Sequence, residues 1–441
     1  MTGVAPFVIG VDVGSSSARA VALDSEGIVI ASSSARYSGA DATATGEVDP
    51  AMWLSGFQAA VSDLGVGTPA ALAIGGYGPC TVSAAGDTAL TFRYPVGDSS
   101  NPRDQHAAQA AELQRRLGAG FEPVLQWDWL VARLGGRSRI QSVWPGDEPL
   151  PKFGEPVSVG VAVGTTSGEL GLAAGIPLVP GSNDGYLTAW AAGIDRPGLG
   201  FDPGGVTGGL GVAVAASGGE QLAPYGIPSA ASGVQIVGGP VAAHGAMLEW
   251  WAGLVGRKLE ELLEAAASIS PGSEGVLVLP FLEGERAPRW NTDLRAEIVG
   301  LHASHDVGVV TRAILEATAF GLAHIARKLA AQGAVLERLV CCGKPSRVPL
   351  WTSIKAAVLE VPVDVPDHRE MAAYGAALAA GAALEWWPIP GAGRSGDWPM
   401  PDVTTVEPEP LTVYRDQLER FIALGDASEE RTLEGDGRER K

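Results

Sequence analysis

The stretch FVIGVDVGSSSARAVALDSEG at residues 7–27 decides the fold. The apolar runs at 7–13 and 18–23 have the length and β-branched content of buried strands, and the small residues at 14–17 are typical of a tight turn. The sequence therefore predicts that the chain opens with a β-hairpin. Asp12 lies inside the first strand, where a carboxylate is costly unless a cation or hydrogen-bond donors offset it.

Strand-like and helix-like segments alternate along the rest of the chain, and the alternation restarts after a loose stretch at 216–232. This pattern predicts an α/β fold with two domains: an N-terminal domain at 1–222, a C-terminal domain at 223–425 and a disordered, charged tail at 426–441. We expect strands within 28–31, 69–78, 233–239, 336–343 and 361–366, helices within 48–65, 101–117, 244–256, 306–333, 348–360 and 369–387, a strand–turn–helix unit at 175–193 and a hairpin at 205–215.

Composition narrows the function classes. The chain has 441 residues, 46% of them hydrophobic, and a formal net charge of −19. This charge argues against nucleic acid and anionic membranes as partners, because both require basic patches. The three cysteines, of which two are adjacent, make a poor disulfide framework and favour the cytoplasm, and we expect neither a signal peptide nor a membrane span.

Two glycine-rich turns between strands are candidate phosphate-binding sites. The first comprises Gly14, Ser15, Ser16 and Ser17, and the second comprises Thr207, Gly208 and Gly209. Small residues leave backbone N–H groups accessible to phosphate oxygens, and an acid beside such a turn, here Asp12, can hold a metal ion. Taken singly, each stretch could equally be an ordinary hairpin turn.

Asp184 is the candidate general base. It lies in GSNDGYLTAWAAG, where a predicted strand ends and a helix begins. A carboxylate at this position can simply cap the helix. It can also stay ionised at the helix N-terminus and accept a proton from a substrate hydroxyl.

A further glycine turn follows the strand in LVCCGKPSR. Gly343 would allow the backbone to approach a flat ligand, and Lys344 follows it. A lysine at such a position can also be merely solvated.

The order of these segments resembles the FGGY family of carbohydrate kinases, within the actin, heat-shock-chaperone and sugar-kinase superfamily. GVDVGSSSARAVALD resembles its first phosphate motif, GVTGGLG the second, and GSNDGYLTAWAAG the segment with the catalytic aspartate. The most specific likeness is the C-terminal block FLEGERAPRWNTDLRAEIVGLHASHDVGVVTRAILEATAFGLAHI, followed by WTSIKAAVLEVPVDVPDHREMAAYGAALAA.

The resemblance implies two ribonuclease H-like (actin-like ATPase) domains, with mixed sheets flanked by helices and an ATP cleft between them. It implies phosphoryl transfer from ATP to a sugar hydroxyl, with Asp184 as the base and Mg²⁺ near Asp12. The first guess for the sugar is a ketopentose such as xylulose, while ribulose, glycerol, erythritol and fuculose stay open. Implied phosphate or ATP contacts are Gly14, Ser15, Ser16, Ser17, Arg19, Thr207, Gly208, Gly209, Gly343 and Lys344; implied substrate contacts are Tyr77, Gly78, Arg103, Asn183 and Asp184.

Two alternatives stay open at this point. The same fold could serve as an ATP-binding scaffold or an ATPase that has lost its sugar acceptor. The chain could also be an unrelated α/β binding protein with coincidental motifs. The resemblance further implies a cytoplasmic protein that can form a homodimer.

Overall fold

The computed structural model describes residues 5–37, 45–96, 102–118, 120–205, 208–216, 227–231, 233–241, 244–393 and 396–439. The chain divides into two compact units. Unit 1 comprises Met1–Asp195, Ile227–Gln235 and Glu370–Pro401, and unit 2 comprises Arg196–Gly226, Ile236–Arg369 and Asp402–Lys441. This division differs from the boundary expected at residue 222, since the chain crosses between the units several times.

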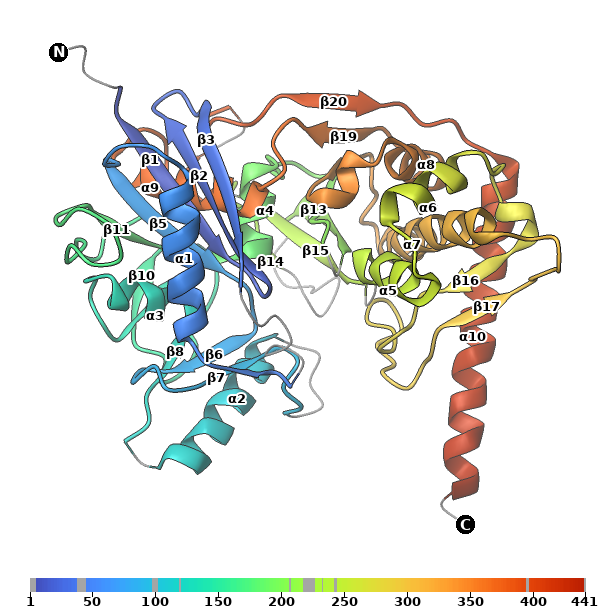
Figure 1. The fold of residues 1–441 in the computed structure, drawn as a ribbon, viewed down its shortest axis with the longest axis horizontal. Coiled ribbons are helices and arrows are strands. Elements are labelled where there is room, and N and C mark those ends of the chain that lie inside the picture. Colours follow the sequence, from blue (N-terminus) through green and yellow to red (C-terminus); the bar gives the residue numbers. More distant parts are fainter. Residues whose placement is uncertain are drawn as a thin grey trace. The chain divides into compact units, whose positions relative to one another are not determined.

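The predicted opening hairpin is confirmed and forms the middle of the main sheet of unit 1 (Figure 1). The strand order is β11-β5-β1-β2-β3, in which β1 pairs antiparallel with β2 and parallel with β5, and β5 pairs parallel with β11. The strands are β1 (Phe7–Val13), β2 (Ser17–Asp24), β3 (Val29–Arg36), β5 (Ala71–Gly76) and β11 (Leu178–Asn183). All residues of β1 and β5 are buried, which accounts for their continuous apolar sequence.

Helices α1 (Ala51–Asp63), α4 (Asp184–Ala191) and α9 (Met371–Ala382) pack on this sheet. The approach of α9 depends on Gly10, because a Cβ atom there would lie 2.0 Å from the backbone nitrogen of Ala377. This close packing explains why residues 370–401 belong to unit 1.

The remainder of unit 1 was largely missed by the sequence patterns. It contains a four-stranded sheet, β4 (Glu47–Val48), β7 (Ala89–Thr91), β6 (Cys80–Ser83) and β8 (Pro123–Leu125), and the pair β9 (Ile140–Val143) and β10 (Glu155–Ser158). The helices here are α2 (Pro102–Leu117), which was predicted, and α3 (Gln126–Arg133). These strands are two to four residues long, too short for a clear alternation.

A seven-stranded sheet, which belongs to unit 2 except for β14 and the first residues of β15, has the order β14-β15-β13-β12-β18-β19-β20. Its strands are β12 (Leu199–Asp202), β13 (Gly209–Ala215), β14 (Ile227–Pro228), β15 (Val234–Pro240), β18 (Arg338–Cys341), β19 (Val363–Pro366) and β20 (Val403–Val406). The helices are α5 (Gly245–Val255), α6 (Leu259–Ala267), α7 (Val307–Ala330), α8 (Pro349–Leu359) and α10 (Thr412–Glu439), with a strand pair β16 (Leu277–Leu279) and β17 (Glu297–Val299) and the short 3₁₀ turns η2 (Ser273–Gly275) and η3 (Lys344–Arg347).

Helix α7 is the one described helix that is long and apolar enough to cross a membrane by length and composition. Most of its apolar window is buried inside unit 2, where α7 packs against α6 and α8. A core helix of a globular domain has the same character, so α7 gives no support for a membrane span.

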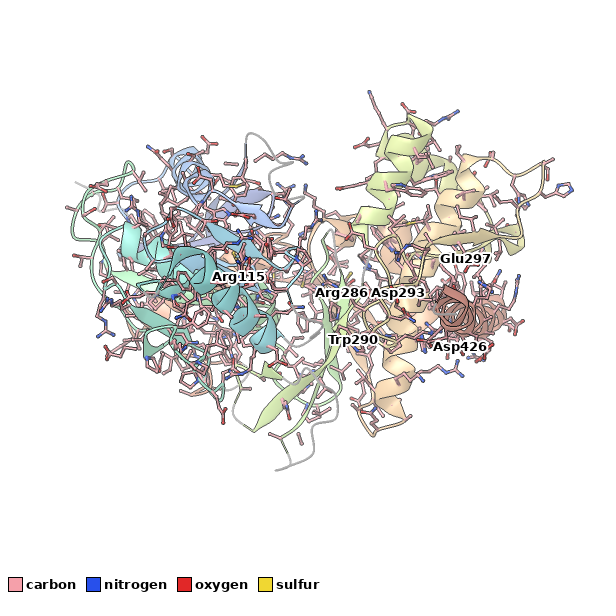
Figure 2. The ribbon with its side chains drawn as sticks, turned by 90° about the horizontal axis from the view of Figure 1, so that it is seen from below. Arg115, Arg286, Trp290, Asp293, Glu297 and Asp426 are labelled. Carbon is pink, nitrogen blue, oxygen red and sulfur yellow. The ribbon has the colours of Figure 1, made fainter. Side chains whose placement is uncertain are left out.

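The expectation of a disordered tail from residue 426 was wrong, because α10 continues to Glu439. Figure 2, which looks along this helix, shows Asp426 on the helix and Glu297 beside it. Asp426 accepts hydrogen bonds from Arg289, while Glu297 accepts from Ser428 at 2.7 Å and from Arg431 at 2.6 Å. Asp426 and Arg431, two charged residues of the expected tail, therefore anchor the helix to Arg289 and to Glu297 of β17.

Candidate functional site

In unit 1, three parallel strands bring candidate residues to one edge of the sheet. Asp12 near the end of β1 is in register with Gly75 of β5, and Asn183 at the end of β11 is in register with Gly76. Carboxyl ends of neighbouring parallel strands are a common place for a ligand. The topology therefore brings Asp12, Gly78 and Asp184 to the same end of the sheet.

Asp12 is offset by Arg19, its cross-strand partner. Arg19 Nη1 donates to Asp12 Oδ2 at 2.8 Å, and Arg19 Nε lies 3.3 Å from Glu370 Oε2. Burial raises the pKa of Asp12, and Arg19 acts against this rise. The expected role of Arg19 in phosphate binding stays a prediction, since in this structure its guanidinium serves two carboxylates.

The first turn is only partly open to a ligand. Gly14 N donates to Ser17 O at 3.1 Å, and Tyr37 contacts the turn through its N–H to Ser16 O and its hydroxyl to Gly14 O. Within the described residues, the amides of Ser15 and Ser16 donate no backbone hydrogen bond. These two amides, rather than the whole turn, are the candidates for contact with a phosphate.

Asn183 is the residue at the N-cap of α4, and Asp184 is the first helical residue. Asn183 Oδ1 accepts from Gly185 N at 2.9 Å, and Asp184 Oδ1 accepts from the same amide at 2.8 Å. Asn183 therefore caps the helix by itself, and capping alone does not explain the presence of an aspartate at position 184. Its second oxygen is available for another partner.

The carboxyl of Asp184 has a pKa suited to proton transfer near neutrality. Burial raises its pKa to about 7, the Asp12 carboxylate adds to the rise, and the Gly185 amide and Arg19 act against it. A general base works best when its pKa lies near the operating pH. Strongly shifted pKa values of this kind are common at functional sites.

The three other predicted substrate residues, Tyr77, Gly78 and Arg103, have different placements. Tyr77 is buried, with its ring in edge contacts with Trp53 and Phe92, so its side chain belongs to the hydrophobic core. Gly78 lies beside Asn183, since a Cβ atom on it would be 3.0 Å from Asn183 Nδ2. Arg103 on α2 donates to the carbonyl oxygens of Glu148 and Pro149.

The sequence patterns missed several polar residues close to these positions. Tyr186, two residues after Asp184, is hydrogen bonded to Asp147, and its ring lies 5.4 Å from that of Trp144. His106 on α2 is buried, shares a hydrogen bond with Thr81, and lies near Gly78. No local pattern marks these side chains, although Tyr186 lies in the quoted Asp184 segment.

In unit 2, the second turn connects β12 and β13, and Thr207 lies outside the described residues. Asp202, the last residue of β12, accepts at Oδ1 from Gly204 N at 3.0 Å and from Gly209 N at 3.4 Å. Gly208 is buried against the ring of His244, since a Cβ atom there would lie 2.6 Å from His244 Cγ.

The Cys341–Cys342–Gly343 turn packs directly on the second turn. A Cβ atom on Gly204 would be 2.0 Å from Cys342 O, and one on Gly343 would be 3.0 Å from Gly204 O. Gly343 has φ of +70° and precedes η3, in which Lys344 is exposed. The predicted phosphate turn and the predicted adenine turn are therefore neighbours within unit 2.

The residues near Asp12 are compatible with one direct metal contact. Asp12 Oδ1 is buried without a hydrogen-bond partner, whereas Oδ2 is taken by Arg19. Among the described residues, no group of three or more His, Cys, Asp or Glu could hold a metal ion by itself. Mg²⁺ commonly takes one or two carboxylates together with substrate phosphates, and this donor set fits that pattern.

Comparison with known proteins gives a family match in the C-terminal half. Residues 222–384 match the C-terminal domain of the FGGY family of carbohydrate kinases. A glycerol kinase from Gloeobacter violaceus is 36% identical over 151 residues, which is 34% of this chain and 30% of that relative. A xylulose kinase from Staphylococcus epidermidis is 27% identical over 128 residues, 29% of this chain and 26% of the relative. The matched part thus spans less than a third of these curated relatives.

The fold is similar over nearly the whole chain. The solved structure of a xyloylose kinase from Brucella ovis superposes with a TM-score of 0.78 at 20% identity, covering 96% of this chain and 99% of that one. The predicted α/β fold with two units is confirmed, since the chain shares its fold with this solved structure. The resemblance carried by the C-terminal block is confirmed as well.

Proposed function

The chain carries the C-terminal domain of the FGGY family of carbohydrate kinases, and from this premise we propose that it transfers the γ-phosphoryl group of ATP to a hydroxyl of a small sugar or polyol. The main support for the proposal is the position and the pKa of Asp184. It stands at the carboxyl end of β11, leaves the cap of α4 to Asn183, and has a pKa raised to about 7. These are the properties of a base that accepts a proton from a hydroxyl group.

In this proposal unit 1 supplies the chemistry on the acceptor. Asp184 orients the acceptor hydroxyl and takes its proton as the oxygen attacks the γ-phosphorus in line. Asp12 raises the pKa of Asp184 and offers Oδ1 to Mg²⁺, which neutralises phosphate charge when bound. The transition state is loose, so position and charge neutralisation supply most of the rate.

Unit 2 supplies nucleotide binding. The amides of Gly204 and Gly209 donate to Asp202, so the second turn receives phosphate oxygens at the Gly208 backbone between them. Gly343 allows adenine to approach the neighbouring turn. The family match at 222–384 covers β15, α5, α7, α8, α9 and Gly343, but it begins after the second turn. The family match therefore supports the role of Gly343, whereas the phosphate role proposed for the second turn rests on its geometry alone.

For the acceptor we propose a ketopentose such as xylulose, with glycerol, ribulose, gluconate and other polyols as competitors. The matched relatives include both a glycerol kinase and a xylulose kinase, so sequence similarity does not choose between them. The residues near Asp184 that would contact an acceptor are Gly78 and three residues with polar side chains, Asn183, Tyr186 and Asp147.

The test is a coupled ADP-release assay with the purified chain, ATP, Mg²⁺ and a panel of ketopentoses, aldoses, polyols and sugar acids. The proposal expects ADP release that depends on one class of acceptor and disappears in Asp184→Asn. Release of ADP at the same rate without any acceptor would instead favour an ATPase, and ADP binding without turnover would favour a scaffold.

Two further expectations belong to the same proposal. The three cysteines, Cys80, Cys341 and Cys342, are free and buried, which suits a reducing compartment, and we place the enzyme in the cytoplasm. A homodimer is the expected assembly, and light scattering of the purified chain measures it.

A further inference from the structure

Unit 2 contains a fully buried lysine whose ammonium group the proposed chemistry does not use. Lys355 on α8 has no exposed surface, and its Nζ lies 2.6 Å from Asp202 Oδ2, 3.1 Å from His244 Nε2 and 3.3 Å from Cys341 Sγ. These are three acceptors for the three N–H donors of an ammonium group. Burying these charged groups has a high desolvation cost, so we asked what role the cluster has in this part of unit 2.

The partners of Lys355 come from elements far apart in the sequence. Asp202 and Cys341 are register partners at the ends of the parallel strands β12 and β18, and His244 immediately precedes α5. His244 also stacks on Trp351, one turn before Lys355 on α8, with ring centroids 4.7 Å apart. The ammonium group therefore ties one helix to two adjacent strand ends and to the start of another helix.

The cluster holds Asp202 as a carboxylate. Burial alone would raise the pKa of Asp202, but the Lys355 ammonium acts against it and the net shift is downward. Burial and the adjacent ammonium lower the pKa of His244 to about 3, so its imidazole is neutral and accepts from Lys355 at Nε2. One cation and one anion thus remain in the cluster at neutral pH.

The second oxygen of Asp202 connects this cluster to the second turn. Oδ1 accepts from Gly204 N on one side of the turn and from Gly209 N on the other. A charged carboxylate is a stronger acceptor than a protonated one, which would also have to place a proton on an oxygen. His244 supports the same turn, because its ring fills the space beside Gly208 and Gly245 N donates to Gly205 O at 3.0 Å.

We propose that Lys355 is a positioning residue for nucleotide phosphates: by keeping Asp202 charged, it holds both sides of the β12–β13 turn in the shape that receives them. The inference rests on the proposed function, since it assumes that this turn binds a nucleotide. It predicts an effect on phosphate recognition that differs from a general loss of stability.

The matched control is a second buried ion pair in unit 2. Arg312 on α7 is 5% exposed, donates to Glu316 at 2.8 Å and to Tyr414 at 2.7 Å, and is not part of the Lys355 cluster. Lys355→Met and Arg312→Met each leave a buried carboxylate without its cation, so both should lower the melting temperature. Only the first removes the support of the second turn.

The experiment measures the Kd of ADP and of adenosine for the full-length chain and its variants, alongside thermal melting. Loss of one or two good phosphate contacts corresponds to about tenfold in affinity, so Lys355→Met should weaken ADP by about that factor. Adenosine, which has no phosphate, should keep its Kd within about twofold, and so should ADP with Arg312→Met, since neither depends on the turn's phosphate contacts.

A double variant distinguishes a loss of phosphate binding from a general loss of stability. Asp202→Asn with Lys355→Met leaves neither charge unpaired, so it should recover much of the melting temperature while ADP stays weak. Recovery of ADP affinity in the double variant would overturn the inference, as would equal weakening of ADP and adenosine, or equal effects of Lys355→Met and Arg312→Met.

The outcomes also separate the two proposals. If the wild-type chain binds no ADP, the proposed function is wrong, and so is the inference, because it assumes nucleotide binding. If wild type binds ADP and Lys355→Met binds it equally well, the inference alone is overturned and the kinase proposal stands.

Discussion

Asp12 and Arg19 face each other across the β1–β2 hairpin, with Arg19 Nη1 2.8 Å from Asp12 Oδ2. The buried carboxylate in the first strand is therefore offset by a cation from the second strand of the same hairpin. Both charges also act on Asp184, Asp12 raising its pKa and Arg19 lowering it. The hairpin thus influences the protonation of the proposed base.

This relationship predicts the pH dependence of turnover. The base must be deprotonated, so kcat/KM at saturating Mg²⁺ should fall about tenfold per pH unit below pH of about 7. Asp12→Asn removes the negative charge that raises the pKa of Asp184, so the acid limb should move to lower pH. The measurement is the pH–rate profile of the residual activity.

A buried aspartate elsewhere in unit 1 provides the control for this shift. Asp128 also has a pKa raised by burial to about 7, but it accepts from Ser142 N. Asp128→Asn should leave the acid limb at its wild-type position. An acid limb that does not move in Asp12→Asn would contradict the coupling between the two carboxylates.

Asp12→Asn should also change the response to Mg²⁺. Its unpartnered Oδ1 is the oxygen that would contact the ion, and an amide oxygen is a weaker ligand than a carboxylate. Titration of activity with Mg²⁺ should therefore show a higher half-saturating concentration than in wild type. The same titration of Asp128→Asn serves as control, and a response unchanged in Asp12→Asn would remove the metal role.

Asp184→Asn should lose activity without losing stability. Removal of a general base typically costs a factor of about 10² to 10⁴ in rate, so turnover should nearly disappear while ADP binding is kept. The pKa of Asp184 is raised on folding to about 7, so the native state binds more protons than the unfolded state between about pH 4 and 7. Wild type therefore loses stability from this group as the pH rises through that window, and the variant does not.

Thermal melts check this sign. The gain in melting temperature of Asp184→Asn over wild type should be larger at pH 8 than at pH 4. A variant that is less stable than wild type at pH 8, or that keeps most of the activity, would argue against Asp184 as a strained catalytic base.

The sequence predicts the parts of the site that depend on local pattern. The sequence predicts the first strand at 7–13, and the structure has it at Phe7–Val13. An apolar run of seven residues that ends at small turn residues is too short for a typical helix and therefore favours a buried strand. Asp184 was placed at a strand–helix junction for a similar reason. The structure departs from expectation in giving the cap to Asn183, a choice between two adjacent residues that both accept from Gly185.

What the sequence could not predict depends on long-range pairing. The resemblance implies that Arg19 contacts phosphate, and this stays a prediction. Its pairing with Asp12 depends on hairpin register, which cannot be read from either strand alone. The sequence predicts a helix at 348–360 but gives no role to Lys355. Its burial requires Asp202, His244 and Cys341, which are separated from it by up to 153 residues.

Gly204→Ala should weaken nucleotide binding through a backbone clash. Gly204 has φ of +58°, and a Cβ atom there would lie 2.0 Å from Cys342 O. Gly256, at the end of α5, has φ of +64° but nothing within 4 Å of a Cβ atom, so Gly256→Ala carries the conformational cost alone. ADP titrations should show weakening by about tenfold for Gly204→Ala, as for the loss of one or two hydrogen bonds, and no change for Gly256→Ala. Equal affinities would contradict a role for the packed turns.

Gly78→Ala tests the acceptor site without touching nucleotide binding. A Cβ atom at Gly78 would lie 3.0 Å from Asn183 Nδ2 and 3.8 Å from His106 Nε2, so the amide of Asn183 must move by a few tenths of an ångström. Because Asn183 is adjacent to Asp184, this movement should raise KM for the acceptor several-fold while the Kd of ADP stays constant. Gly67 has nothing within 4 Å of a Cβ atom, and Gly67→Ala should leave both constants unchanged. An acceptor KM that does not respond to Gly78→Ala would place the acceptor away from the end of β5.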